Sequence, residues 1–151
     1  MLYKIQLPMD TNWAIQFRRR GINETWGPEL RFRTVKNTTP PVKPSTPTVA
    51  PVLGQLVITW DGFGVGGAEY LPDLNRVEVH VSDVKGFAPT TLTMIDQFST
   101  AGSSQVRMAS DLVYGTTYYV KLQAVNNSGT RSEPSDEVFD VVRRILSLIH
   151  I

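Results

Sequence analysis

The chain has 151 residues, 41% of them hydrophobic and 19% charged, with a formal net charge of +1 and no cysteine. This composition is typical of a folded globular protein and excludes disulfides, thiolate chemistry and an overall field that would recruit nucleic acid or an anionic membrane. No apolar run approaches the roughly 20 residues that span a bilayer, and "MLYKIQLPMDTNW" lacks the pattern of an export signal, so we expect a soluble chain.

The first element in chain order is one half of an internal repeat. The stretch "LPMDTNWAIQF" (Leu7–Phe17) has a near-copy 105 positions later in "LVYGTTYYVKL" (Leu112–Leu122), with Trp13 falling on Tyr118. A repeat of about this length indicates duplication of a whole domain. Residues 1–35 are therefore predicted to be the C-terminal strands of a truncated domain, whose apolar side chains lack the sheet against which they would pack.

A linker and a complete domain are predicted next. Residues 36–46 are rich in Pro and Thr, which favours an extended, semi-rigid spacer. From residue 40 to residue 142, apolar and polar residues alternate with period two between turns rich in Gly, Pro, Asn, Asp and Ser. The predicted strands lie in "PTVAPV", "QLVITWDG", "LNRVEVHVSD", "TLTMIDQF", "SQVRMASDL", "TTYYVKLQAVN" and "DEVFDVV". This pattern predicts an all-β antiparallel sandwich of two sheets with about seven strands, the first at an edge because it holds two prolines.

The alternation also assigns side chains to faces. On each predicted strand the alternate apolar residues share one face. These groups are Leu56, Ile58 and Trp60; Val77, Val79 and Val81; Val106 and Met108; and Tyr118, Val120, Leu122 and Ala124. The predicted core contains Trp60, Val77, Val79, Leu112, Tyr118, Val120 and Leu122. The opposite faces carry Glu78, His80 and Ser82, and Thr117, Tyr119, Lys121 and Gln123, which we expect to face solvent.

Residues from about 41 to 142 resemble a fibronectin type III domain. The resemblance rests on Trp60 in "VITWDG", on the "L-x-x-G-T-x-Y" pattern of Leu112, Gly115 and Tyr118, and on "AVNNSGTRSEPS" before the last strand. It implies an immunoglobulin-like sandwich in which Leu112 closes a corner, Gly115 adopts a positive φ and the Tyr118 hydroxyl bonds to nearby backbone. The chain departs from the family in having Tyr114 in place of the usual proline and, in the partial copy, Trp13 in place of the tyrosine.

A narrower resemblance concerns function. "DLNRVEVHVSDVKGFAP" followed by "YGTTYYVKLQAVNNSG" is similar to fibronectin type III repeats in minor tail or tail-tip proteins of bacteriophages. It implies a non-catalytic spacer or adhesion module in the virion, with other domains of the tail protein, neighbouring tail proteins and a host-surface glycan or protein as partners. The alternatives are an accessory module of a secreted bacterial carbohydrate-active enzyme and a eukaryotic receptor or matrix fragment. The sequons at Asn23, Asn37 and Asn126 are compatible with the last of these.

No enzymatic chemistry is predicted from the residues. His80 has no second histidine or cysteine at metal spacing, and Ser103 and Ser104 lack a nucleophile-elbow motif. The glycines of "GFGVGGAEY" (Gly62, Gly64, Gly66 and Gly67) are followed by no phosphate-binding Lys-Ser/Thr, and the acidic loops lack the spacing of a calcium site. We therefore expect no catalytic, cofactor-binding or metal-binding residue, and no cofactor.

Two groups of surface residues remain. Arg18, Arg19, Arg20, Arg31 and Arg33 form the one basic cluster, which we interpret as a solvated edge and not as a nucleic-acid site. Tyr119, Phe63, Tyr70 and Phe87 are aromatic contacts for a partner or plugs that cover the edge of the core. The sequence does not identify the partner-binding residues.

The two ends suggest a metagenomic fragment. Residues 143–151 form a tail, and "LSLIHI" (146–151) resembles the translation of a transposon-end sequencing adapter. Met1 is then an internal methionine. The alternative interpretation is a short apolar tail or strand extension of the protein itself. As given, residues 40–142 are expected to fold, while residues 1–35 are expected to be mobile or to self-associate through unpaired edges.

Overall fold

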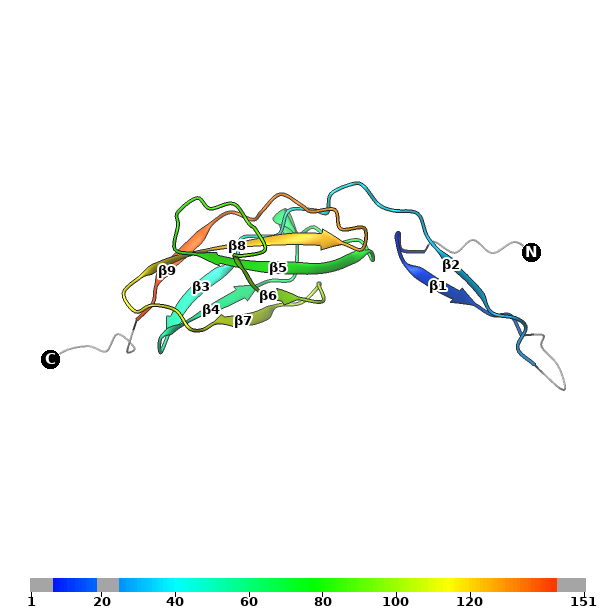
Figure 1. Ribbon diagram of the computed structural model, residues 1–151, viewed down its shortest axis with the longest axis horizontal. Helices are drawn as coiled ribbons and strands as arrows, with labels where there is room; N and C mark the ends of the chain where they lie inside the picture. Colours follow the sequence, from blue (N-terminus) through cyan, green and yellow to red (C-terminus); the bar gives the residue numbers. More distant parts are fainter. Residues whose placement is uncertain (1–6, 19–24, 144–151) are drawn as a thin grey trace.

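The computed structural model describes residues 7–18 and 25–143, and its main body is a seven-stranded β-sandwich (Figure 1). A short hairpin precedes the sandwich, and a single 3-10 turn, η1 (Val65–Gly67), interrupts the loop after β4. The strands are β1 (Asn12–Ile15), β2 (Leu30–Arg33), β3 (Thr48–Val52), β4 (Gln55–Trp60), β5 (Leu74–Ser82), β6 (Met94–Phe98), β7 (Gln105–Ala109), β8 (Thr117–Asn126) and β9 (Val138–Val141).

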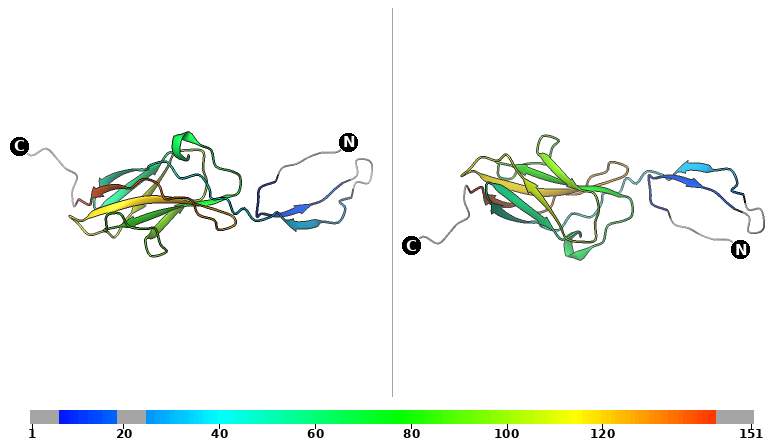
Figure 2. Two further views of the ribbon diagram at one scale, coloured as in Figure 1. Left: turned by 90° about the horizontal axis from the view of Figure 1, so that it is seen from above. Right: turned by 90° about the horizontal axis from the view of Figure 1, so that it is seen from below.

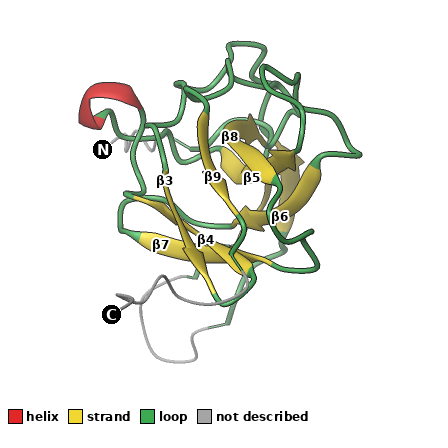
Figure 3. Ribbon diagram, turned by 90° about the vertical axis from the view of Figure 1, so that its left-hand side faces the viewer, coloured by secondary structure: helices red, strands yellow, loops and turns green. Residues whose placement is uncertain are grey.

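The sandwich is formed by two antiparallel sheets. One has the strand order β3-β4-β7 and the other the order β6-β5-β8-β9, and the end-on view in Figure 3 shows them as two layers. The predicted fold class, an immunoglobulin-like β-sandwich of about seven strands, is therefore confirmed. The proline-containing strand β3 lies at a sheet edge, as predicted, because Pro51 has no N–H to donate to a second neighbour.

The space between the sheets holds the predicted core. Trp60 of β4 and Phe98 of β6 come from opposite sheets, are both fully buried, and have ring centroids 5.2 Å apart. The other fully buried apolar side chains include Leu56, Ile58, Val77, Val79, Val120, Leu122 and Ala124. Alternation thus predicted the inner face of β4, β5 and β8 correctly.

The corner before β8 is built as the sequence predicted. The Val113 N–H donates to the Tyr118 hydroxyl at 3.1 Å, and Gly115 has a φ of +77°. Leu112 and Tyr118 are half-buried and pack against the core cluster. A side chain at residue 115 would be strained in this left-handed conformation, so the glycine is required by the turn.

Strand β7 shows its apolar side chains to the outside. Val106 and Met108 lie in line, but they are 48% and 51% exposed, because cross-strand pairing with Thr59 and Val57 places them on the outer face. The inward position between them is Arg107, whose guanidinium lies 4.9 Å from the centroid of the Phe98 ring. The long arginine side chain thereby covers the edge of the core while its charged end reaches solvent.

The loop after β4 is tightly packed against neighbouring segments. Gly62 has a φ of +91°, and a Cβ there would lie 2.2 Å from the Ser103 carbonyl oxygen. At Gly64, a Cβ would lie 2.3 Å from a methyl carbon of Val42. These two glycines of "GFGVGG" are therefore explained by close packing against the neighbouring loop at Ser103 and against the Val42 side chain.

The N-terminal hairpin lies beyond one end of the sandwich. Strands β1 and β2 pair antiparallel from Asn12↔Arg33 to Ile15↔Leu30, and Figure 2 shows this hairpin projecting away from the sheets, on the side opposite the end of β9. The connecting residues lie against the sandwich, where Val65 N–H donates to the Lys43 carbonyl and Pro44 bridges to Gly64.

The buried core predicts a large difference between two leucines. Leu122→Ala removes a side chain that is 0% exposed and should lower the free energy of unfolding by about 2–5 kcal/mol, because a cavity is left between the sheets. Leu92→Ala, at a position 94% exposed, should change it by less than about 0.5 kcal/mol. Urea denaturation of both variants measures this, and equal effects would contradict the assigned inner face of β8.

Candidate functional sites: a buried charge cluster and the joint with the hairpin

The outer face of β5 holds a buried cluster of charged side chains. Glu78 and His80 were expected to face solvent, and this expectation is wrong: their side chains are 2% and 1% exposed. Strand β5 lies between β6 and β8, and residues of the loop before β6 border the same site, where a small cavity is lined by Pro89, Thr90 and Glu78 among others. Alternation assigned the side chains to the outer face correctly, but the following loop covers that face.

Two arginines neutralise the Glu78 carboxylate. Arg76 donates from Nε and Nη2 to Oε1 at 2.9 and 2.7 Å, and Arg131 donates from Nη1 to Oε2 at 2.5 Å. Burial by itself raises the pKa of Glu78, but the hydrogen bonds from Arg131, Arg76 and His80 outweigh it, so the pKa lies below its usual value. Glu78 is thus a buried anion whose charge is fully compensated.

His80 connects this carboxylate to the loop. Its Nε2 lies 3.0 Å from Glu78 Oε2, and its Nδ1 lies 2.9 Å from Thr93 Oγ1. The Thr93 hydroxyl also accepts from the Thr90 N–H at 2.9 Å and lies 3.0 Å from the Thr90 carbonyl oxygen. Burial lowers the pKa of His80, and the neighbouring carboxylate opposes this only in part.

The Thr93 hydroxyl, the His80 imidazole and the Glu78 carboxylate lie in the order found in nucleophilic catalysis. Here, however, the hydroxyl and the carboxylate have other hydrogen-bond partners. The Thr93 hydroxyl closes a turn with Thr90, and the Glu78 charge is taken by two arginines. What the arrangement does in the described structure is hold the loop before β6 against β5. Sequence reasoning missed it; the signal available was Glu78 and His80 on one face, with Arg76 nearby in the same strand.

The aromatic candidates divide into plugs and exposed rings. Tyr70 packs on Trp60 at a centroid distance of 6.0 Å, and Phe87 is 8% exposed beneath the Lys121 ammonium. Tyr70 therefore packs against the core cluster, whereas Phe87 is buried on the outer side of β8. Tyr119 faces outward and stacks at 5.7 Å on Phe139, which is 64% exposed, whereas Phe63 is half-buried and its carbonyl accepts from the Trp60 indole.

The arginines of the hairpin do not form one basic patch among the described residues. Arg31 pairs with Glu29 at 2.7 Å, and Arg33 pairs with the buried carboxylate of Asp10. Arg18 lies over the Trp26 ring, 5.0 Å from its centroid. Arg19 and Arg20 lie outside the described residues.

Two of the three sequons are closed to modification. Asn126 is 2% exposed and donates to the Asn37 carbonyl, while the Asn37 side-chain amide donates to Asp73. Asn37 is itself 8% exposed, so both side-chain nitrogens that a glycan would need are buried and bonded. The third sequon, at Asn23, lies outside the described residues. The two sequons that the structure describes, at Asn37 and Asn126, therefore do not support a glycosylated receptor fragment.

These asparagines belong to a polar joint between the hairpin and the sandwich. The Asn37 N–H donates to Ser128 Oγ at 2.7 Å, and its carbonyl accepts from Asn126 and Thr130 at 3.0 and 2.9 Å. The Asn37 amide reaches Asp73 at 2.8 Å. One residue of the connecting segment is therefore fixed by the β4–β5 and β8–β9 loops together.

The hairpin contributes its own groups to the joint. Asp10 is 4% exposed, and the pKa of its carboxyl is lowered by hydrogen bonds from Arg33 and then from Ser128. One residue further, the Asn127 amide donates to Thr11 Oγ1 at 3.0 Å. The turn before β1 is thus tied to the β8–β9 loop through Thr11 and Asn127.

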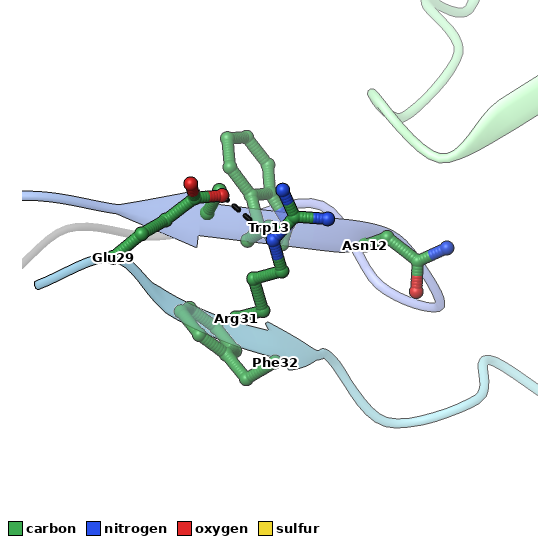
Figure 4. A pocket seen from close by; sticks show the side chains of 6 residues that line it. Asn12, Trp13, Glu29, Arg31 and Phe32 are labelled. Atoms are coloured by element: carbon green, nitrogen blue, oxygen red, sulfur yellow. Dashed lines mark ion pairs between the residues drawn. The ribbon is translucent and has the colours of Figure 1, made fainter.

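The outer part of the hairpin carries a hollow of about 510 Å³ that includes Trp13, Phe32 and Arg31 (Figure 4). In Figure 4 a dashed line marks the Arg31–Glu29 ion pair at 2.7 Å. The Trp13 indole N–H is buried and has no hydrogen-bond partner among the described residues.

Comparison with solved structures identifies the fold. A fibronectin type III domain of a human fibronectin type III domain containing protein 3 superposes with a TM-score of 0.52 at 16% identity, covering 72% of this chain and 91% of that one. The sandwich has the fibronectin type III fold. The chicken CNTN1 FN1-FN3 domains superpose with a TM-score of 0.52 at 12% identity, over 91% of this chain and 44% of that one.

A third similar structure is the spore cortex lytic enzyme SleM of Clostridium perfringens, with a TM-score of 0.50 at 15% identity over 87% of this chain and 38% of that one. At such identities the likeness concerns the fibronectin type III fold alone. No protein-family model and no curated protein matches the chain.

Two further observations bear on the kind of site that the described residues offer. Among residues 7–18 and 25–143, no group of three or more His, Cys, Asp or Glu side chains is placed to hold a metal ion. Over the same residues, no helix is long and apolar enough to cross a membrane.

The charge cluster predicts a strong effect of removing its anion. Glu78→Ala removes the acceptor of Arg76 and Arg131, whose side chains are partly exposed, so it should lower the free energy of unfolding by about 1–3 kcal/mol. The matched control is Glu133→Ala on the exposed surface, which should change it by less than about 0.5 kcal/mol. Urea denaturation measures both, and equal effects would show that the cluster does not hold the loop.

The pKa directions predict a loss of stability in mild acid. Because the pKa of folded His80 lies below its ordinary 6.5, the unfolded chain takes up the proton first as the pH falls below 6.5, and stability present above that pH declines. Glu78, whose pKa also lies below its ordinary 4.5, adds a second decline below pH 4.5. Free energies of unfolding at pH 7.5, 5.5 and 4.0 measure this. His80→Gln should flatten the upper part of the profile, and an unchanged slope between pH 7.5 and 5.5 would contradict the assignment.

Proposed function

We propose that the chain is a non-catalytic structural and adhesion module of a bacteriophage tail protein, which acts as a spacer between domains or contributes a host-surface contact. Its partners are the other domains of the same protein, neighbouring tail proteins and a glycan or protein of the host surface. Its location is the virion. The polar joint between the hairpin and the sandwich is the observation that carries this proposal.

The joint favours a spacer because it fixes direction. A linker rich in Pro and Thr limits the distance between two domains but not their relative rotation. Here the connecting segment is also held by the buried bonds of Asn37, and Asp10 and Thr11 tie the hairpin to the β8–β9 loop. The tandem CNTN1 fragment covers 91% of this chain, against 72% for the single human domain, which supports an arrangement of consecutive modules.

The alternative function is an accessory module in a secreted bacterial carbohydrate-active enzyme. The similarity to SleM, named as a spore cortex lytic enzyme, favours it, since part of that enzyme superposes on this chain. In both functions any catalytic residues lie in other domains, and the sandwich positions them or binds a surface.

Removing one residue of the joint should release the hairpin. In Ser128→Ala the Asn37 N–H loses its acceptor, so the hairpin should reorient relative to the sandwich more freely than in the unaltered chain. Residual dipolar couplings of β1–β2 and of β3–β9 should fit one alignment tensor in the unaltered chain and two in the variant. Ser104→Ala, on an exposed loop, is the matched control and should keep one tensor. Two tensors in the unaltered chain would contradict the spacer.

The location is tested by proteomics of the source sample. Trypsin releases residues 77–85, "VEVHVSDVK", between Arg76 and Lys85. This peptide should be enriched in density-banded phage particles, and antibodies against the sandwich should reduce adsorption of those particles to host cells if it makes the host contact. Enrichment among soluble secreted proteins with polysaccharide-hydrolase activity would instead support the alternative.

A further inference from the structure

One face of the β1–β2 hairpin is apolar and only partly covered: Trp13, Ile15 and Phe32 are half-buried. Cross-strand pairing places Trp13 beside Phe32 and Ile15 beside Leu30, so these four side chains share a face. Leu30 is 60% exposed, and Phe17, just after β1, is 75% exposed. The opposite face pairs Asn12 with Arg33 and Ala14 with Arg31, which is the composition of a solvated surface.

The hairpin repeats the geometry of β8–β9 residue by residue. In the hairpin, Asn12 to Ile15 pair with Arg33 to Leu30; in the sandwich, Thr117 to Val120 pair with Val141 to Val138. The first strands are related by the 105-residue shift of the internal repeat. A four-residue pairing with the same register thus occurs in both copies.

Two backbone hydrogen bonds repeat outside the paired strands. Thr34 N–H donates to the Thr11 carbonyl at 3.0 Å, and the corresponding bond runs from Val142 to Thr116 at 3.1 Å. Beyond the strands, Gly27 N–H donates to Phe17, as Ser135 does to Leu122, both at 2.8 Å. The two segments are therefore the same structural unit, and what surrounds β8 indicates what β1 requires.

In the sandwich, that unit is covered on one face and paired along one edge. Val120 and Leu122 are fully buried, packed in one core cluster with Leu56, Ile58 and Trp60 of β4. Along its other edge, β8 pairs with β5 from Tyr119 to Asn126. Strand β1 pairs with β2 alone among the described strands, and a two-stranded hairpin whose apolar face is only half-buried is marginal in water.

We propose that the apolar face of the hairpin is the docking surface for a further β-sheet unit of the β3–β7 kind, which lies in the same polypeptide ahead of the hairpin and completes a second sandwich. This unit supplies one antiparallel strand to the free edge of β1 and a sheet with an apolar inner face over Trp13, Ile15 and Phe32. The indole N–H of Trp13 is a donor for its backbone. The inference rests on the modular arrangement of the proposed function but not on a location in the virion.

A chain with a second β3–β7 unit tests the proposal. Residues 40–111 are joined directly to Leu7 of the chain, so that Leu7 takes the place that Leu112 has in the sandwich. Amide exchange across residues 13–15 should slow at least tenfold relative to the unaltered chain, and light scattering should give a monomer. Unchanged exchange in the extended chain would overturn the proposal.

The matched control carries Ile15→Asp in the same extended chain. Ile15 corresponds to the fully buried Val120, so the charge should abolish the added protection, while exchange in β8 stays as it was. Protection that survives Ile15→Asp would contradict docking on this face. Protection of the unaltered chain that rises with its concentration would identify a second copy as the occupant and would also overturn the proposal. These outcomes do not depend on whether the peptide is found in phage particles.

Discussion

The packing of Trp60 against Phe98 joins the two sheets, and the rest of the sandwich depends on it. The ring of Trp60 on β4 lies 5.2 Å from that of Phe98 on β6, and its indole N–H donates to the Phe63 carbonyl at 3.0 Å. The hydrogen bond from the Trp60 indole fixes the start of the loop after β4. The loop that contains η1 is therefore anchored to the core by the same side chain. Burial of apolar area between sheets is the main favourable term for such a fold, and every strand contributes through its alternate residues.

The sequence predicted the strands because alternation reports directly on faces, but it did not predict what covers an outer face. Val77, Val79 and Val81 were assigned inward correctly, whereas Glu78 and His80 are buried because the loop before β6 covers them. Coverage depends on the path of a loop, and the period of a strand carries no information about that path. The same limit applies to Val106 and Met108, whose alternation was recognised but whose face was set by pairing with β4. The polar joint was also not predicted, because Asn37, Asp73 and Ser128 are far apart in the sequence.

The buried charges are explained better by specificity than by stability. Glu78 with two arginines gains little over an apolar trio, because desolvation of the ions offsets their attraction. What the cluster adds is a set of donors and acceptors that only one position of the loop satisfies: His80 must face Thr93, and Arg131 must reach across from the β8–β9 connection. The outer face of a central strand is thereby closed without extending the apolar core, and the neighbouring cavity remains polar at its Glu78 and Arg131 wall.

The two copies of the repeat differ where the joint requires it. Gly115 has a positive φ before β8, and its counterpart 105 residues earlier is Asp10, which has a φ of +46°. Glycine is the least strained residue at such a position, and aspartate is one of the few others found there regularly. In the first copy the backbone turn is kept, and the side chain that glycine lacks supplies the carboxylate that Arg33 and Ser128 bind. A turn that only connected strands would have no need of this carboxylate. Asp10 thereby keeps the turn of the repeat and also supplies a carboxylate at the joint between the hairpin and the sandwich.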